Sequence, residues 1–282
     1  MINKDFFVTK KPTSVFLQEY IAYYYFHKCS DVETQKKYIF YPHYKNALSI
    51  YKNSTVFRES NEYHTKPDLS CDYYYAYGGV HKEFKRVTQQ PPFFKIGIVF
   101  QPLGVNHFIT KNLAELQKKK KDVSFNYFKT SMQPFLDDIY SLENITSKVD
   151  LLDTYFEEQY VGFEEMRLKK AVELLLNTDK KHTVKVLAEQ LEMNRKTLLR
   201  LFQKHLCCSV KDYINVVQFR KALLSYQLAE NKPLLTSLAY DTGYYDQSEF
   251  INHFKKITGF NPTKVLANIQ KLGNEDTFWT LR

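Results

Sequence analysis

The sequence has few of the residues that stabilise small secreted or fibrous proteins. Only four cysteines occur among 282 residues, none of them in a CxxC pattern, and Cys207 directly precedes Cys208. We therefore expect reduced, buried thiols and neither disulfides nor a zinc site. Eight glycines and nine prolines are too few for a collagen-like or low-complexity chain. No uncharged apolar run reaches about 18 residues, so we expect no transmembrane helix.

The common sequence motifs of enzymes are also missing. The chain has no glycine-rich phosphate loop, no GxSxG nucleophile elbow and no HExxH metal motif. His43, His64, His81 and His107 could ligate a metal, but no HxH or HxxxH spacing links any two of them. The N-terminus lacks a long apolar segment with a small-residue cleavage site. We expect a cytoplasmic protein that is not an enzyme and uses no metal or cofactor.

Positive charge is concentrated in the last third of the chain. Lys and Arg number 40 against 31 Asp and Glu, a formal net charge of +9. Residues 180–282 hold 16 basic and 9 acidic side chains and so carry +7, while residues 1–179 carry the remaining +2. This asymmetry indicates an anionic partner, with nucleic acid as the first candidate.

The N-terminal half has the pattern of a β-barrel or β-sandwich. Short segments rich in Tyr, Phe, Val and Ile alternate with turn residues, as in 36–42, 47–53, 63–79 and 92–104. Aromatic residues are 16% of the chain. They could fill the core, or they could line a pocket for a sugar or an aromatic effector, for which the candidates are Tyr73, Tyr75, Tyr77 and Phe84.

Apolar residues recur at helical spacing in the middle of the chain. We expect helices over 112–121 and 134–159, with the four lysines at 118–121 as a solvated helix end. The polar stretch 157–165 is the expected joint between two domains, and the chain beyond it is predicted to be almost entirely helical.

Residues 183–205 have the pattern of a helix-turn-helix unit. Asn194 is a good N-cap for the second helix, on which Leu198, Leu201 and Phe202 share an inward face. The opposite face carries long polar side chains, which suit a recognition helix because they can reach base edges or phosphates: Arg195, Lys196, Arg200 and Gln203.

The same layout recurs over 234–257. Gly243 suits a left-handed turn at the end of the first helix, and Asp246 is a plausible N-cap for the second. Phe250 and Phe254 point inward, and the polar candidates for DNA contact are Gln247, Ser248, Glu249, Asn252 and Lys255.

Residues 209–230, between the two units, are predicted to form one long helix. A rigid helix would hold the units apart so that both could enter successive major grooves, which repeat every ~34 Å. Either unit alone could be a generic helical hairpin with solvated lysines, but their occurrence in tandem favours DNA binding.

Residues 165–268 resemble the DNA-binding domain of the AraC/XylS family of bacterial transcription regulators. The similarity lies in LAEQLEMNRKTLLRLFQKH, in YINVVQFRKALLSYQL and, most specifically, in LAYDTGYYDQSEFINHFKKITGFNP. The resemblance implies two helix-turn-helix units joined by a long helix, with the nine polar residues named above on the two DNA-facing helices. Four positions depart from the family pattern, which puts local turn geometry in question: Glu192 and Cys207 stand where glycine is usual, Val210 where proline is frequent and Leu234 where Ser or Thr caps a helix.

The N-terminal half is more loosely similar to the sensor domains of this family. YPHYKNALSIYKN and VFQPLGVNHFI resemble segments of a cupin-like body followed by helices. This similarity implies a ligand-binding or dimerising module.

The sequence thus predicts an α+β protein of two domains. Residues 1–160 form a β-rich domain, a cupin-like barrel plus helices. Residues 161–178 hold the joint and the first helix of an all-α DNA-binding domain over 165–268, and residues 269–282 are a C-terminal tail. We expect a sequence-specific transcription regulator that binds double-stranded promoter DNA; RNA polymerase, a small-molecule effector and a second copy of the chain are left open as further partners. The alternative is a cupin-like barrel enzyme or ligand-binding protein with an appended helical domain.

Overall fold

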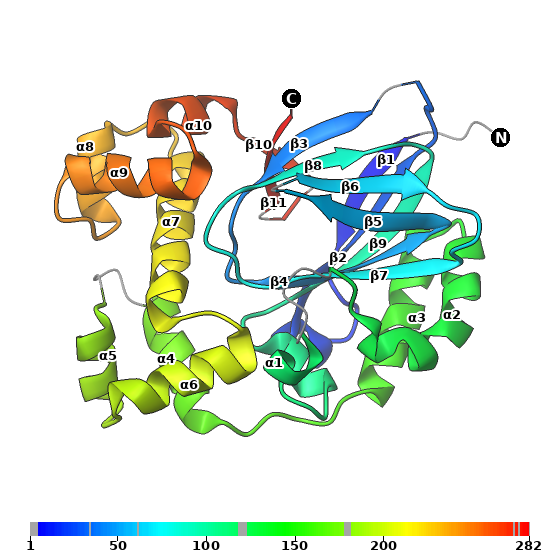
Figure 1. Cartoon of the computed structure of the whole chain (residues 1–282), viewed down its shortest axis with the longest axis horizontal. Coiled ribbons are helices and arrows are strands. Elements are labelled where there is room, and N and C mark those ends of the chain that lie inside the picture. The colour runs from blue at the N-terminus through cyan, green and yellow to red at the C-terminus, as the bar shows by residue number, and fades with distance from the viewer. Residues whose placement is uncertain are drawn as a thin grey trace.

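The computed structural model describes residues 5–33, 35–60, 62–117, 123–177, 182–272, 274–275 and 277–281. Its N-terminal part is rich in β-strands, and its C-terminal part is helical, as predicted (Figure 1). We call the part from Asp5 to Tyr160 the β-rich domain and the part from Met166 to Asn268 the helical domain. The tetralysine at 118–121 lies outside the described residues.

Two sheets form the β-rich domain. The first sheet has five strands in the order β1-β2-β9-β4-β7, all antiparallel: Phe6–Lys10, Ile21–Cys29, Phe93–Phe100, Asn46–Lys52 and Tyr73–Gly78. The second has the order β10-β11-β3-β8-β6-β5, in which only β6 and β8 pair in parallel: Gln270–Leu272, Thr277–Leu281, Lys36–Phe40, Lys85–Gln89, Glu62–Pro67 and Ser54–Glu59.

The first sheet is covered on both faces. On β9, Ile96, Ile98 and Phe100 belong to a core shared with helices, while Lys95 and Val99 line a cavity on the other face. The helices of that core are α2 (Lys129–Ser141) and α3 (Ile145–Glu158). Because successive side chains of a strand point to opposite faces, the apolar run of β9 supplies both layers.

The expected helix over 134–159 is two helices. The chain breaks at Leu142 because Asn144 caps α3, accepting hydrogen bonds from the backbone N–H groups of Thr146 and Ser147. The helix expected over 112–121 is described only as a short α1, Leu113–Leu116. Three short 3-10 helices complete the domain: Leu17–Glu19, Gly104–Phe108 and Asn126–Phe128.

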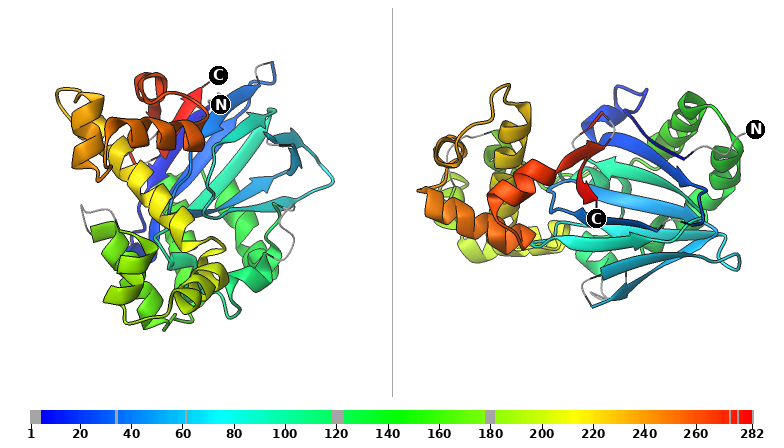
Figure 2. Two further views of the ribbon diagram at one scale, coloured as in Figure 1. Left: turned by 60° about the vertical axis from the view of Figure 1, so that its left-hand side comes forward. Right: turned by 90° about the horizontal axis from the view of Figure 1, so that it is seen from above.

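Seven helices make up the helical domain in the described part of the chain. They are α4 to α10: Met166–Asn177, Val184–Gln190, Arg195–Leu206, Val210–Leu228, Leu235–Asp241, Gln247–Thr258 and Pro262–Asn268. Figures 1 and 2 show this domain on one side of the sheets and α2 and α3 on another.

The segment beyond the last helix differs from the predicted tail. Its described residues form the antiparallel strands β10 and β11, and β11 pairs with β3 in the register Trp279 with Phe40, Thr280 with Ile39 and Leu281 with Tyr38. The end of the chain therefore returns from the helical domain to the second sheet of the β-rich domain. The sequence offered no local signal for this, because the partner strand lies more than two hundred residues away.

We predict that deletion of residues 270–282 destabilises the protein. The deletion leaves the backbone of β3 without its neighbour on one side, and each lost hydrogen bond contributes about 0.5–1.5 kcal/mol. The midpoint of thermal unfolding, followed by circular dichroism, should fall by several degrees. A melting curve that coincides with that of the intact chain would show that this strand pairing contributes nothing.

Candidate nucleic-acid interface and inter-sheet cavity

The first helix-turn-helix unit consists of α5 and α6. The Thr183 side chain caps α5 by accepting from the backbone N–H of Val186 at 3.2 Å. Asn194 caps α6 as predicted, accepting from the N–H of Lys196 at 2.8 Å. These caps satisfy donors that a helix end otherwise leaves unpaired, so local side chains fix where both helices begin.

Helix α6 separates an apolar face from a polar face. Leu198, Leu201 and Phe202 are buried in the core of the helical domain. All four predicted contact residues of this helix are exposed in the intact chain: Arg195, Lys196, Arg200 and Gln203. The β-rich domain therefore leaves this polar face accessible.

The second unit repeats this arrangement in α8 and α9. Gly243 has a φ of 78° in the turn, a conformation that glycine adopts without a steric penalty, and Asp246 caps α9 by accepting from the N–H of Glu249. Phe250 and Phe254 are fully buried. On the outer face Ser248, Asn252 and Lys255 are exposed.

Two of the predicted contact residues of α9 also make hydrogen bonds within the second unit. The Thr236 hydroxyl donates to the Gln247 side-chain oxygen at 2.9 Å, and the backbone N–H of Tyr245 donates to a Glu249 carboxylate oxygen at 2.8 Å. Both side chains are partly buried. These hydrogen bonds stabilise the start of α9. They give the acidic Glu249 a structural role on a surface that is expected to face the phosphates of DNA.

The helix between the units is α7, with 19 residues from Val210 to Leu228. At a rise of 1.5 Å per residue it is about 28 Å long, on the scale of the major-groove repeat of ~34 Å. Figure 1 shows α6 near one end of this helix and α9 near the other. The two units are thus separated along one rigid element.

Two of the four departures from the family pattern are visible in the backbone. Glu192 and Cys207, which stand where glycine is usual, have φ values of 51° and 55° and so lie in the left-handed region. Leu234 precedes α8 without a side-chain cap. Val210 is the first residue of α7, a position that accepts proline.

Hydrogen bonds between described residues tie the helical domain to the β-rich domain at several places. The Asn106 side chain donates to the carbonyl of His205 at the end of α6, at 3.3 Å. Arg220, on α7 and only 1% exposed, donates through Nε to the carbonyl of Pro42 at 2.7 Å. The backbone N–H of Phe84 donates to the carbonyl of Ile257 in α9, at 2.8 Å. Both units and the helix between them are therefore anchored to the same domain.

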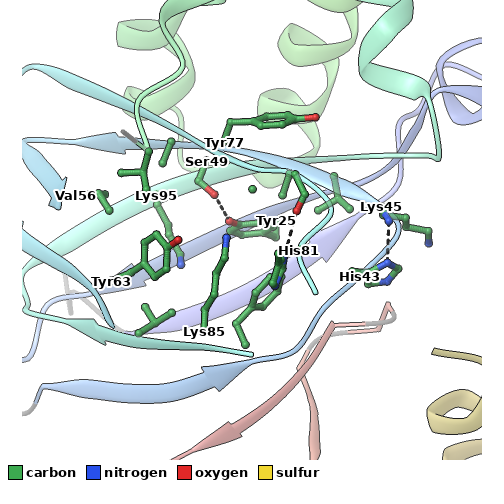
Figure 3. Close-up of a pocket in the computed structure, with 18 of the residues that line it drawn as sticks. Tyr25, His43, Lys45, Ser49, Val56, Tyr63, Tyr77, His81, Lys85 and Lys95 are labelled. Carbon is green, nitrogen blue, oxygen red and sulfur yellow. Dashed lines mark hydrogen bonds between the residues drawn. The ribbon is translucent and has the colours of Figure 1, made fainter. Parts of the chain in front are cut away.

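A cavity of about 160 Å³ lies between the two sheets (Figure 3). Strands of both sheets line it, and Arg220 is the residue that reaches it from the helical domain. Tyrosine rings form much of its wall, and the Tyr25 hydroxyl lies 2.6 Å from that of Ser49. Gly97 makes room for Tyr25, since a Cβ atom there would come within 1.9 Å of the tyrosine ring. We call this space the inter-sheet cavity.

The inter-sheet cavity is lined by basic side chains. Lys95 is 2% exposed, and burial lowers its pKa from 10.5 to about 7. Burial likewise lowers the pKa of Lys85 to about 8, with a smaller effect of Arg58 in the same direction. Lys45 and Arg220 also line the space. A ligand here would meet a positive, water-poor environment.

The four aromatic residues predicted to bind an effector are dispersed. Tyr77 is the one that lines the cavity, and its ring also stacks on Phe125. Tyr73 and Tyr75 lie in the core beneath α2 and α3, and Tyr77, on the same face of β7, belongs to that core as well. Phe84 packs against the helical domain near Phe260. Sequence reasoning missed Lys95 and Arg220; a lysine inside the apolar run PFFKIGIVF was the one available signal.

None of the helices in the described part of the chain is long and apolar enough to cross a membrane. Among the same residues, no group of three or more His, Cys, Asp or Glu side chains is arranged to hold a metal ion.

Two family models match parts of the chain. Residues 187–268 match the family model of a helix-turn-helix domain, and residues 11–122 match that of a domain of unknown function, DUF6597. No curated protein matches the chain.

Several solved structures are similar in architecture. An apo variant of ToxT from Vibrio cholerae strain SCE256 has 13% identity and a TM-score of 0.48, covering 92% of this chain and 99% of that one. Wild-type ToxT from the same strain, bound to an unsaturated fatty acid, has 14% identity and a TM-score of 0.46, covering 98% and 100%. The C-terminal domain of AraT, a response regulator from Geobacillus stearothermophilus, has 21% identity and a TM-score of 0.34, covering 39% and 90%. These values are too low to carry over a ligand or an activity.

We predict that Cys207→Gly stabilises the protein. Glycine adopts the left-handed conformation of this residue without a Cβ clash. We expect this gain to exceed the cost of the larger conformational entropy of glycine in the unfolded chain. The free energy of unfolding, measured by urea titration, should therefore rise by about 0.5–1 kcal/mol. Cys207→Ala is the matched control, because it removes the thiol and keeps the Cβ atom. Equal stability of the two variants would show that the backbone conformation is not the cause.

Proposed function

We propose that this chain is a DNA-binding transcription regulator of the AraC type, in which α6 and α9 read two neighbouring major-groove segments of one promoter. The match of residues 187–268 to a helix-turn-helix domain supports this proposal. The observation that carries this proposal is the pair of exposed polar helix faces at opposite ends of α7, both accessible in the intact chain. Binding to a promoter also requires that the protein and the DNA are in the same cellular compartment.

The two helices differ in the chemistry they offer to DNA. Helix α6 presents two arginines and a glutamine, Arg195, Arg200 and Gln203, which can pair with guanine and adenine edges respectively. Helix α9 presents Asn252, an amide that also suits adenine, and Lys255, which suits a phosphate. With Gln247 and Glu249 held in the turn, we propose that α6 contributes more to base discrimination than α9.

We further propose that the β-rich domain regulates this binding through the inter-sheet cavity. Arg220 belongs to the helix that separates the two units, and it also lines the cavity. A ligand that moves Arg220 would therefore move α7 relative to the β-rich domain. The hydrogen bond from Arg220 to the carbonyl of Pro42 would be the contact through which such a motion is passed between α7 and the β-rich domain.

We predict that Arg200→Ala and Arg195→Ala each weaken specific DNA binding by about 1–3 kcal/mol where the arginine makes a bidentate base contact. A preferred site is first selected from random duplexes with the purified full chain, and affinities are then measured by fluorescence anisotropy at fixed salt. Arg58→Ala is the matched control, because this exposed arginine lies on β5, in the β-rich domain.

A salt titration separates the two expected roles. Lys255→Ala should weaken binding to all sequences alike and reduce the dependence of log affinity on log salt by about one unit, as expected for a lost phosphate contact. Arg200→Ala should mainly reduce the preference for the selected site. If neither arginine variant of α6 changes affinity or preference, α6 takes no part in reading the DNA.

A further inference from the structure

We propose that a cleft between the β-rich domain and α4 binds a free α-amino acid with an apolar side chain. The described residues that line this cleft do not overlap with those that line the inter-sheet cavity. The inference goes beyond the proposed function, because it depends neither on DNA binding nor on a ligand between the sheets. We call this space the joint cleft.

The joint cleft lies where the chain passes from one domain to the other. One wall comes from the β-rich domain and the other from α4. Beside it, the backbone N–H groups of Val161 and Gly162 donate to the carbonyl of His107, at 2.9 and 3.2 Å, and His107 itself lines the cleft. The volume of about 460 Å³ is within the range of about 300–1,000 Å³ that is usual for small-molecule sites. The position and the size therefore suit a small ligand that touches both domains.

The wall of the joint cleft carries both signs of charge. Lys169 and Glu173 stand one turn apart on α4, and Glu19 lines the cleft from the β-rich domain. Among the described residues, no ion pair joins Lys169 to either glutamate. A ligand with one carboxylate and one ammonium group could pair with both kinds of side chain, and such charge-assisted hydrogen bonds are stronger than neutral ones. An α-amino acid carries these two groups on a single carbon atom.

His107 indicates where the carboxylate of the ligand lies. Its side chain is 6% exposed, and burial, together with the positive charge of Lys169, lowers its pKa to about 4, so the ring is neutral at pH 7. The buried Nδ1 atom has no hydrogen-bond partner among the described residues. Buried N–H groups without an acceptor are rarer than buried acceptors without a donor, so we expect the proton on Nε2. This N–H and the ammonium group of Lys169 then form a pair of donors for one carboxylate.

Apolar and aromatic side chains complete the wall. Leu103, Val172 and Leu176 line the cleft together with the rings of Tyr20 and Tyr160, whose centres are 5.2 Å apart. The two tyrosine hydroxyls lie 3.2 Å from each other, so each phenol already has a polar partner. What this part of the wall offers a ligand is apolar surface, which suits the side chain of leucine or phenylalanine better than a second charged group.

A ligand in the joint cleft would also lie next to the packing of the first helix-turn-helix unit. Val172 lines the cleft and belongs to the core that contains Leu198 and Phe202 of α6. Leu103, from the β-rich domain, is part of the same core. An amino acid bound here would therefore contact the side chains through which the β-rich domain, α4 and α6 meet.

The experiment measures binding to the full chain by isothermal titration calorimetry in the absence of DNA. The probes are L-leucine and L-phenylalanine. Each is compared with an analogue that lacks the ammonium group (4-methylpentanoate or 3-phenylpropanoate) and with one that lacks the carboxylate (3-methylbutylamine or 2-phenylethylamine). We expect at least one amino acid to bind with one site per chain and at least about tenfold more tightly than either of its analogues, because each analogue loses one charge-assisted contact.

A lysine variant tests the carboxylate end of the site. Lys169→Gln removes the ammonium group, and we expect it to weaken binding of the amino acid at least about tenfold. Lys170→Gln is the matched control, since Lys170 is the exposed neighbour on the same helix and does not line the cleft. It should bind the amino acid as the wild type does.

A glutamate variant tests the ammonium end. The double variant Glu19→Gln, Glu173→Gln should also weaken binding at least about tenfold. The double variant Glu158→Gln, Glu189→Gln is its control, because it changes one exposed glutamate in each domain outside the cleft. Melting curves establish that all four variants are folded.

The proposal is overturned if neither amino acid binds, if an analogue binds as tightly as its amino acid, or if Lys169→Gln or the Glu19, Glu173 double variant retains the affinity of the wild type. DNA binding is measured separately with the selected duplex. A chain that binds the amino acid but no DNA would refute the regulator proposal and keep the ligand assignment.

Discussion

The position of α7, between the two helix-turn-helix units and against the β-rich domain, is the constraint on which the rest of the structure depends. Ten of its 19 residues are buried, and they face the first unit, the second unit and the β-rich domain in turn. Its polar residues are used inside the protein as well: Gln218 donates to the carbonyl of Gly243 at 3.0 Å, and Arg220 donates to that of Pro42. Both units therefore pack on the same helix.

The cavity is a consequence of how the first sheet is covered. Its outer face packs on α2 and α3 through large apolar side chains, and its inner face meets the second sheet across tyrosines and lysines. A buried lysine in this position costs stability, because desolvation disfavours the ammonium form. Such a residue is retained more readily when binding requires it, as at many functional sites with perturbed pKa values.

The helical domain could be predicted from the sequence because its signals are local. Asn194 and Asp246 cap helices that begin within two residues of them, and Gly243 supplies a turn that needs no distant partner. The cavity could not be predicted in the same way. Tyr73, Tyr75, Tyr77 and Phe84 were predicted to line one pocket, but which face of a strand meets the helices depends on sheet packing that the sequence does not encode locally. The pairing of β11 with β3 could not be predicted for the same reason. The hydrogen bond from the backbone N–H of Tyr245 to Glu249 depends on the conformation of the turn, which is known only from the structure.

The geometry of α7 also determines what the proposed regulation would have to accomplish. A helix of about 28 Å is shorter than a groove repeat of ~34 Å, so the tilt of each unit would have to supply the remaining separation if both units enter successive grooves. Each unit is tied to the β-rich domain at its own site, the first through Asn106 and the second through Phe84. Because packed interfaces move between discrete arrangements more readily than they deform, a small shift of the β-rich domain would tilt the units relative to one another without bending α7. A mechanism in which the two units change their relative tilt would use the anchors at both units. A mechanism in which the β-rich domain uncovers the DNA-facing surfaces of α6 and α9 would require those surfaces to be covered, and both are accessible in this structure.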